Sequence, residues 1–335
     1  MTIISAFSSR VFEIDASAVA ESAARTLREI VFRRLRRRGA VVGLSGGIDS
    51  SVTAALCVRA LGKNRVFGLL MPEDESSGDS LKLGRMLAET LGIASSVENI
   101  GPVLRALGCY QRRDEAIRKV IPEYGDGWKS KIVLPNLLEG SYYALYSVVA
   151  QLPDGETRRV RLTAEAYLGI VAATNFKQRT RKMLEYYHAD RLWYAVAGTP
   201  NRLEYAQGFF VKNGDGSADF KPIAHLYKTQ VYELGRHLGV PEEILRRPPT
   251  TDTYSLEQSQ EEFYFSLPLE MMDLCLYGKN HGVPTAEVAG ATGLSGEQVQ
   301  RVYAMIDSKL SSTQYLHLAP QLIENVSEVH LDGVE

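Results

Sequence analysis

The sequence predicts an α/β fold in which helices flank a parallel sheet on both faces and a helical part follows at the C-terminal end. Three observations support this prediction. Short apolar runs at 40–44, 65–71 and 94–98 alternate with segments of helical periodicity, which is typical of parallel strands joined by crossover helices. The first run leads into a Ser/Gly turn that opens a helix. The region from about 231 to 312 is helical in pattern almost throughout.

The elements follow in a regular order. An amphipathic helix over 15–38, which Asp15 can cap, leads into the first strand. The central elements are expected to be strand 40–44, helix 49–61, strand 65–71, helix 79–91, strand 94–98, helix 101–107, helix 181–189 and a buried strand in 193–199. The C-terminal helices are expected at 231–238, 241–246, 269–277, 285–292 and 295–310.

Between about 108 and 172 the strand–helix alternation stops. Two apolar runs flank the turn at 152–155, which predicts a hairpin. We interpret 1–335 as a single domain, 108–172 as an insertion into it, and 255–312 as its helical C-terminal part.

The composition is that of an ordinary globular chain, with 335 residues, 45% hydrophobic residues and a formal net charge of −2. Such a charge gives no reason to expect nucleic acid or a membrane as a partner. Cys57, Cys109 and Cys275 lie far apart and form no CxxC pair, which disfavours disulfide, zinc and thiol-redox functions. No apolar run approaches the length of a membrane span, so we expect a cytoplasmic protein.

The stretch 40–51, AVVGLSGGIDSS, is an apolar strand, a Ser/Gly turn and the start of a helix. Glycines let the backbone approach an anion closely, and hydroxyl groups and the free N–H groups of the helix supply donors. The stretch therefore predicts a nucleotide-phosphate site, but it is neither a Walker A loop nor a GxGxxG fingerprint. The residues of this loop that are expected to bind the nucleotide are Gly43, Leu44, Ser45, Gly46, Gly47, Asp49, Ser50 and Ser51.

A second motif spans 197–231 and opens with Ala-Gly-Thr-Pro-Asn-Arg-Leu-Glu. It carries too many charges for a core segment and too many aromatic residues for a linker. Its charged residues include Glu204, Lys212, Asp215, Asp219 and Lys228.

These motifs resemble a known family. The loop at 43–51 is similar to the Ser-Gly-Gly-x-Asp-Ser loop of the ATP pyrophosphatases, which cleave ATP between its α and β phosphates. With 175–181, 197–231 and 240–250, it resembles the NAD synthetases, ammonia-dependent ligases that amidate deamido-NAD. The similarity covers roughly 20–105 and 172–312 in the family's order. It implies an adenine-nucleotide α-hydrolase-like, Rossmann-like three-layer fold.

The chemistry of that family explains the residue types. A carboxylate accepts ammonia only after activation, which adenylation by ATP provides. The resemblance implies ATP as co-substrate and Mg²⁺ held by Asp49 and Glu204, since Mg²⁺ is commonly held by carboxylates with phosphates and waters. The alternative for Asp49 is a carboxylate that stabilises the N-terminus of a helix.

The resemblance also assigns further roles. It implies that Lys228 binds the phosphates, that Thr199 and Thr250 contact ATP or the adenylate, and that Asp215 lies near the reacting centre. Lys228, Thr250 and Asp215 are thus the expected catalytic residues. Lys228 could instead be a solvated lysine and Asp215 a turn residue.

For the carboxylate substrate, the resemblance points to residues expected to hold a dinucleotide. Arg179 suits a pyrophosphate, but it is equally explained as a charge on a helix face. Phe209 is either a stacking partner for the pyridine ring or a core aromatic. The expected substrate residues are Asn175, Arg179, Phe209, Lys212 and Asp219.

No covalent nucleophile is evident, and the chain has no room for a nitrilase-like domain with a catalytic cysteine. We therefore expect free ammonia, or ammonia from a separate glutaminase, as the nitrogen donor. The resemblance further implies a homodimer with substrate bound near its interface.

The chain departs from the family in three places. The family's Gly-Gln-Thr-Asp-Glu-x-Glu-Leu-Gly segment is replaced by 257–265, EQSQEEFYF; the 108–172 segment is additional; and 308–314 replaces a Lys/Arg-rich tail. These differences leave open a paralogue that amidates another carboxylate. Further alternatives are a tRNA-modifying ATP pyrophosphatase and a nucleotide-binding regulator. A helix-turn-helix DNA reader over 283–306 is less favoured than structural helices.

Overall fold

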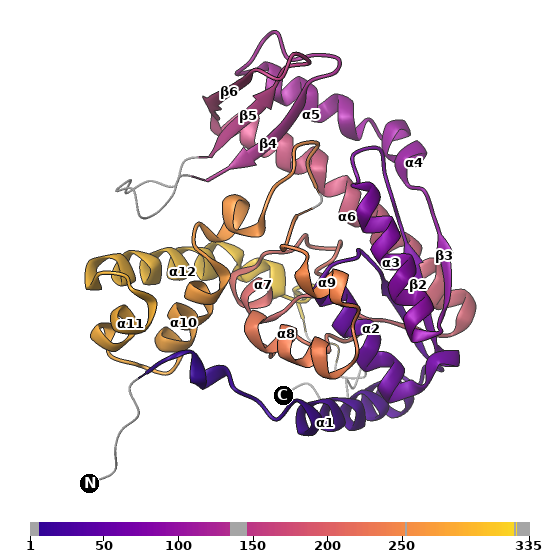
Figure 1. Ribbon diagram of the computed structural model, residues 1–335. Helices are drawn as coiled ribbons and strands as arrows, with labels where there is room; N and C mark the ends of the chain where they lie inside the picture. Colours follow the sequence, from indigo (N-terminus) through magenta and orange to yellow (C-terminus); the bar gives the residue numbers. More distant parts are fainter. Residues whose placement is uncertain (1–6, 135–145, 252, 325, 327–335) are drawn as a thin grey trace.

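The computed structural model describes residues 7–134, 146–251, 253–324 and 326. Its centre is a four-stranded parallel sheet of strand order β3-β2-β1-β7 (Figure 1). The strands are β1 (Ala40–Gly43), β2 (Val66–Leu70), β3 (Ala94–Val97) and β7 (Ala195–Val196). The residues of β1 and β7 are buried or nearly so, as expected for parallel strands covered on both faces.

Two helical layers cover this sheet. The helices are α1 (Ala16–Arg28), which continues as the π-helical turn η2 (Glu29–Arg34), α2 (Ile48–Leu61), α3 (Gly78–Leu91), α4 (Gly101–Ala106), α6 (Ala164–Leu192) and α8 (Lys228–His237). Successive side chains of a strand point to opposite faces of the sheet. Val42 of β1 therefore packs with α1, α2, α3 and α8, whereas Val41 packs with α4 and α6 on the other face. The predicted three-layer α/β fold is confirmed.

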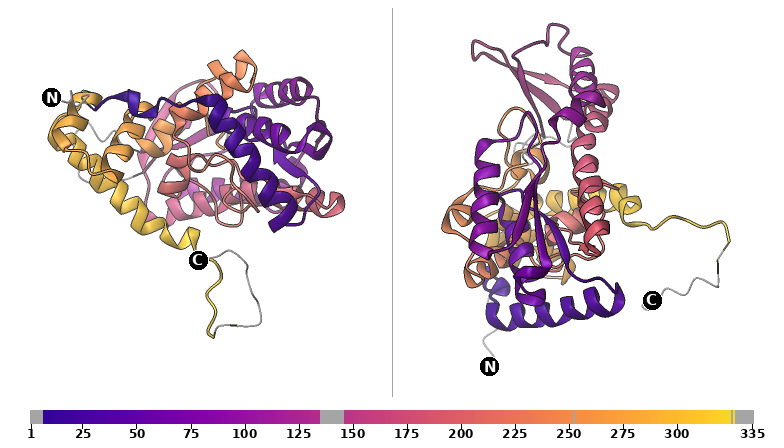
Figure 2. Two further views of the ribbon diagram at one scale, coloured as in Figure 1. Left: turned by 90° about the horizontal axis from the view of Figure 1, so that it is seen from below. Right: turned by 90° about the vertical axis from the view of Figure 1, so that its right-hand side faces the viewer.

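A second, antiparallel sheet of order β4-β5-β6 packs one face on α5 (Cys109–Arg118) and on the first half of α6. Its strands are β4 (Lys129–Val133), β5 (Ser147–Gln151) and β6 (Thr157–Arg161). The hairpin expected around 152–155 is confirmed, since β5 pairs with β6 across this turn. The right-hand view of Figure 2 shows α6 extending from this small sheet down along the large one.

The C-terminal part is helical, as predicted, and shares a second core with Phe12 of the N-terminal turn η1 (Ser9–Phe12). This core contains Phe265, Met272, Val299 and other apolar residues. The elements of this part are the π-helical turn η5 (Glu261–Phe265), α10 (Leu269–Asn280), α11 (Thr285–Thr292) and α12 (Gly296–His317). The short helix α7 (Arg202–Gln207) contributes Leu203 to the same core, whereas α9 (Glu242–Arg246) packs with its Ile244 in the core of the parallel sheet. The short turn η3 (Lys63–Arg65) precedes β2.

Several elements differ in length from the sequence prediction, among them α6 and β7. Helix α6 has 29 residues and includes the predicted 181–189 segment. It buries polar residues, among them Lys177, Lys182 and Glu185, so it has no apolar stripe that periodicity would detect. The strand expected within 193–199 is only Ala195–Val196, because the chain then leaves the sheet at a bridge between Ala197 and Phe220.

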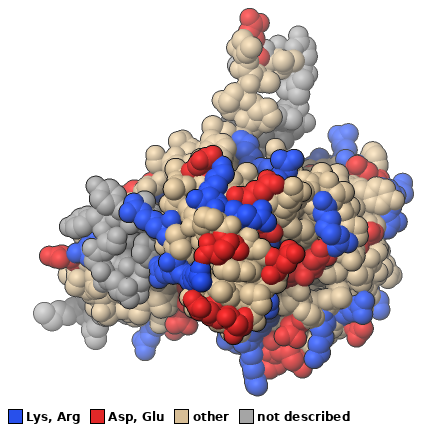
Figure 3. Space-filling model, turned by 90° about the horizontal axis from the view of Figure 1, so that it is seen from above, with Lys and Arg blue, Asp and Glu red and all other residues tan. Residues whose placement is uncertain are grey.

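Lys/Arg and Asp/Glu side chains are mixed on the face that carries the small sheet (Figure 3). None of the helices in the described ranges is both long enough and apolar enough to span a bilayer.

Candidate active site

A cavity of about 990 Å³ lies beside the carboxyl ends of the parallel strands, where ligands bind in open α/β sheets. It extends from the Ser/Gly loop after β1, past the loop after β7 and η5, to α12. It brings together most of the residues predicted from sequence: Ser45, Gly47, Asp49, Ser50, Asn175, Arg179, Thr199, Glu204, Phe209, Lys212, Asp215, Lys228 and Thr250.

The Ser/Gly loop is shaped to receive an anion at the start of α2. Gly46 has a φ of +74°, and a Cβ atom there would lie 2.7 Å from the carbonyl oxygen of Ser80. Gly47 is the N-cap of α2 and provides no side-chain cap. The first N–H groups of α2 therefore remain available for a phosphate. The hydroxyl groups of Ser45 and Ser50 lie 3.0 Å apart beside them.

Arg247, which the sequence analysis did not single out, binds the same loop. Its Nη2 donates to the Oγ atoms of Ser80 at 2.9 Å and Ser77 at 3.2 Å, and its Nη1 lies 3.4 Å from the carbonyl oxygen of Gly46. A guanidinium group is thus held next to the proposed phosphate position. The only sequence signal was its place in the 240–250 motif.

A buried polar cluster lies next to this loop. The ammonium of Lys228 pairs with Oδ2 of Asp49, and Nδ2 of Asn201 donates to Oδ1 of Asp49 at 3.1 Å. The backbone N–H of Asn201 donates to Oε2 of Glu204 at 3.1 Å. Nε2 of Gln260 donates to Oε1 of Glu204 at 2.9 Å. Asp49, Glu204 and Lys228 therefore form one hydrogen-bonded group.

The charges in this cluster affect one another. Burial, together with the neighbouring charge of Asp49, raises the pKa of Glu204 above its usual range. Burial alone would lower the pKa of Lys228, but the charges of Asp49 and Glu204 outweigh burial, so the pKa of Lys228 is raised. One cation thus balances two carboxylates in a buried site.

The two carboxylates suit a hard divalent cation, because Mg²⁺ prefers oxygen ligands. Within the described ranges, no group of three or more His, Cys, Asp or Glu side chains is placed to hold a metal. A Mg²⁺ ion at Asp49 and Glu204 would therefore complete its coordination with phosphate oxygens and water, as Mg²⁺ commonly does.

Asp215 lines both the large cavity and a smaller one of about 210 Å³ that includes Gly43 and Leu44. Its Oδ1 accepts from the backbone N–H of Val211 at 2.8 Å, as a turn residue would. Burial raises the pKa of Asp215, and the nearby charge of Lys182 opposes this shift. Asp215 therefore stabilises a turn through its side chain and also lines both cavities.

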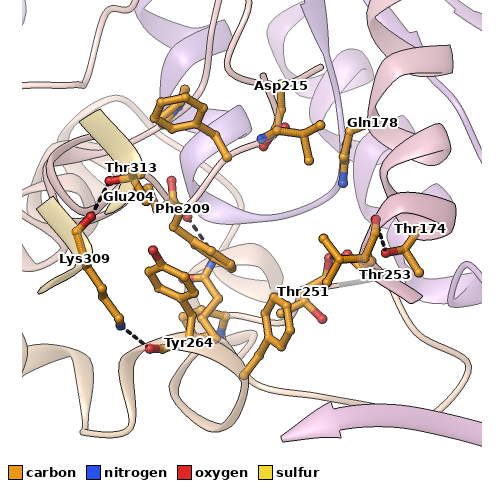
Figure 4. A pocket seen from close by; sticks show the side chains of 18 of the residues that line it. Thr174, Gln178, Glu204, Phe209, Asp215, Thr251, Thr253, Tyr264, Lys309 and Thr313 are labelled. Atoms are coloured by element: carbon orange, nitrogen blue, oxygen red, sulfur yellow. Dashed lines mark hydrogen bonds between the residues drawn. The ribbon is translucent and has the colours of Figure 1, made fainter. Parts of the chain in front are cut away.

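The far end of the cavity is aromatic (Figure 4). Phe209 stacks on Tyr264 with ring centroids 4.6 Å apart and meets Phe265 edge-on at 5.5 Å. Phe209 therefore has core-like packing while it also lines the cavity. Arg179 on α6 donates to the carbonyl oxygen of Lys212 at 3.3 Å, which joins two walls of the cavity.

Three of the predicted site residues, all within the described ranges, line neither of these two cavities: Gly46, Ser51 and Asp219. The hydroxyl of Ser51 donates to the carbonyl oxygen of Gly47 at 2.8 Å and stabilises the loop. Oδ2 of Asp219 accepts from the backbone N–H of Val196 at 2.7 Å, so this carboxylate anchors the last strand. The cavity is also lined by Gln178, Tyr264 and Lys309, which no sequence pattern marked as site residues.

Comparisons with known proteins show which family the sequence matches. The sequence model of the NAD synthase family matches residues 19–122 and 157–313. The NH(3)-dependent NAD(+) synthetase of Rhizobium meliloti (strain 1021) is 61% identical over 323 residues, which is 96% of each chain. The enzyme of the same name from Mesorhizobium japonicum is 60% identical over 94% of this chain and 99% of its own.

Solved structures share the fold. NMN synthetase from Francisella tularensis superposes with a TM-score of 0.65 at 22% identity, covering 93% of this chain and 100% of its own. The NH3-dependent NAD synthetase of Campylobacter jejuni gives a TM-score of 0.61 at 22% identity with the same coverage.

Proposed function

Since the chain belongs to the NAD synthase family, we propose that it is an ammonia-dependent ligase that converts deamido-NAD to NAD and cleaves ATP to AMP and pyrophosphate. The observation that carries this proposal is the continuity of one cavity. The phosphate loop, the Asp49–Lys228–Glu204 cluster and the aromatic end all line it. ATP and a carboxylate substrate can therefore meet in one cavity.

The reaction needs two displacements. A carboxylate oxygen of the pyridine acid attacks the α-phosphorus of ATP, and pyrophosphate leaves. The resulting acyl-adenylate accepts ammonia at its carbonyl carbon, a proton is lost from nitrogen, and AMP leaves. Both steps develop negative charge on oxygen, so positioned cations and N–H donors accelerate them.

Several groups are suited to hold the triphosphate. The uncapped start of α2 and the hydroxyls of Ser45 and Ser50 supply donors at one end. Lys228 supplies a buried positive charge, and Arg247 a second cation at the loop. We propose that Thr199 and Thr250, which also line the cavity, contact ATP or the adenylate.

We propose that Asp49 and Glu204 hold Mg²⁺ on the phosphates. When bound, the ion neutralises charge on the leaving pyrophosphate. The raised pKa of Glu204 supports this role, because a buried acid beside another acid gains from a nearby cation.

We propose that Asp215 orients ammonia or accepts its proton, since its carboxyl group is buried and its pKa is raised. Asn175, Arg179, Phe209 and Lys212 are the proposed dinucleotide contacts. Asp219, which the resemblance also suggested, is better explained by its bond to β7.

A second candidate function is an ATP-dependent ligase that amidates a carboxylate other than deamido-NAD. The aromatic residues at 263–265, which replace the family's usual residues, favour it, because Phe263 and Tyr264 line the end of the cavity where we place the carboxylate substrate. The two candidates share the ATP chemistry and differ in the acid that is activated.

We further propose a homodimer, a cytoplasmic location, and ammonia taken from solution or from a separate glutaminase. The three cysteines are buried and unpaired, which suits a reducing compartment. Light scattering of the purified protein tests the dimer, which predicts twice the mass of one 37.1 kDa chain.

The direct test mixes the purified protein with deamido-NAD, ATP, Mg²⁺ and ammonium. NAD, AMP and pyrophosphate are expected in equal amounts. ADP as the product would rule out adenylation, and AMP formation only with another acid would favour the second candidate.

A further inference from the structure

Lys309 is a half-buried lysine of α12 that lines the aromatic end of the cavity. Its Nζ donates to the carbonyl oxygen of Tyr264 and lies 3.8 Å from the centre of the Tyr264 ring and 5.5 Å from that of Phe265. Figure 4 shows it beside Tyr264 and Phe209. An ammonium has three N–H donors. Within the described ranges only one of them has a hydrogen-bond acceptor.

Among the residues that the structure describes, no carboxylate forms an ion pair with this lysine. Glu262 of η5 pairs with Lys131 at 2.8 Å, and Asp307 of α12 pairs with Lys279 at 2.8 Å. Burial alone lowers the pKa of Lys309 to about 7. An anion that enters the cavity would provide the opposite charge that the described side chains do not supply there.

Three elements fix the position of Lys309. The hydroxyl of Tyr264 donates to the carbonyl oxygen of Gln207 in α7 at 2.6 Å, which holds η5 against α7. The hydroxyl of Thr313 donates to the carbonyl oxygen of Lys309 at 2.7 Å. Phe209 stacks on the ring that Lys309 covers. The ammonium is therefore held in place before a ligand arrives, which limits the entropy lost on binding.

The other lysines of the cavity are engaged differently. Lys228 pairs with Asp49 at the phosphate end, whereas Lys212 donates to the carbonyl oxygens of Tyr315 and Leu318 at the edge. Lys309 is thus placed to contact the acceptor rather than ATP.

We propose that Lys309 is a specificity-determining residue that binds an anionic group of the acceptor dinucleotide. The inference rests on the proposed function, because deamido-NAD brings two sources of negative charge, its diphosphate and its pyridine carboxylate. A charge-assisted hydrogen bond to either would favour this acceptor over neutral analogues.

The test measures binding by calorimetry with three variants. Lys309→Met removes the charge and the donors, Lys309→Gln keeps a donor for the Tyr264 carbonyl without a charge, and Lys309→Arg keeps the charge. Lys279→Met is the matched control, because it removes a lysine that contacts α12 outside the cavity. Melting temperatures verify that each variant is folded.

We expect both neutral variants to weaken deamido-NAD binding by about 10- to 100-fold, with ATP binding changed less than twofold. Lys309→Arg should restore most of the affinity, and Lys279→Met should change neither ligand. If Lys309→Met does not fold, the binding of both ligands is compared between Lys309→Gln and the wild type instead. Unchanged acceptor affinity in the folded neutral variants, or an equal loss for ATP, would overturn the proposal.

NAD as a second ligand separates the two anions. If Lys309 contacts the diphosphate, the neutral variants weaken NAD and deamido-NAD alike; if it contacts the carboxylate, they weaken deamido-NAD alone. Either result supports the proposal. Wild-type protein that binds neither dinucleotide would refute the proposed function itself, a result distinct from failure at Lys309.

Discussion

Replacing Lys228 by Met should destabilise the protein in a way that Mg²⁺ reverses. Lys228 is 3% exposed, and its ammonium is the cation that balances Asp49 and Glu204. Removing one partner of a buried ion pair costs about 3–5 kcal/mol, since the remaining charge keeps its desolvation penalty. Here two carboxylates would be left facing each other.

The size of the effect follows from the length of the chain. With about 2.1 cal/mol/K of unfolding entropy per residue, 335 residues give about 0.7 kcal/mol/K, so the melting temperature should fall by about 4–7 °C. Mg²⁺ supplies the missing positive charge and should raise the melting temperature of the variant more than that of the wild type.

The loss should also depend on pH. In the variant the pKa of Glu204, which burial already raises in the wild type, lies above that of the unfolded chain, so folding takes up protons. The deficit is therefore largest at pH values above the raised pKa of Glu204 and shrinks as the pH falls through that pKa. Scanning calorimetry at two pH values, each with and without Mg²⁺, measures both effects.

A matched control is Lys182→Met, which removes a buried lysine paired with Glu185 at 2.5 Å and leaves Asp49, Glu204 and Lys228 in place. It should be destabilised without rescue by Mg²⁺. A loss below about 1 kcal/mol for Lys228→Met, or equal Mg²⁺ stabilisation of both variants, would refute the reasoning.

Three further predictions test other parts of the site. Asp49→Asn and Glu204→Gln should abolish turnover while circular dichroism stays native, because they remove the proposed Mg²⁺ ligands; near-normal rates would exclude both residues from the mechanism. Arg179→Ala should raise KM for deamido-NAD about tenfold and change KM for ATP little; the opposite pattern in steady-state kinetics would place the acceptor elsewhere. Gly46→Ala should lower the free energy of unfolding, measured by chemical denaturation, by about 1–3 kcal/mol and weaken ATP binding. Residue 46 has a φ of +74°, and the new Cβ atom would lie too close to the carbonyl oxygen of Ser80. A stable variant with unchanged ATP affinity would contradict the loop geometry.

The sequence predicted the part of the site that follows from strand order. Asp49 and Glu204 each come shortly after a strand of the parallel sheet, and parallel strands end at one edge, so their proximity was predictable. The family resemblance added Lys228, which the structure places against Asp49. Local periodicity also located most of the helices.

Other features depend on contacts between distant segments. Arg247 reaches Ser80, and Lys309 reaches Tyr264, through packing that no local pattern encodes. Helix α6 was underestimated because Lys177 is fully buried there and bonds to Glu73 at 3.0 Å, so a charged residue occupies a core position. Asp219 resembled a ligand in sequence, yet its carboxylate bonds to the backbone of β7.

The most direct test of the central claim follows an oxygen atom. Deamido-NAD labelled with ¹⁸O in its carboxylate is incubated with the protein, ATP, Mg²⁺ and ammonium, and AMP is examined by mass spectrometry. Attack of the carboxylate on the α-phosphorus predicts one ¹⁸O atom in each AMP formed. Unlabelled AMP, or label in ADP or inorganic phosphate, would contradict activation through an acyl-adenylate.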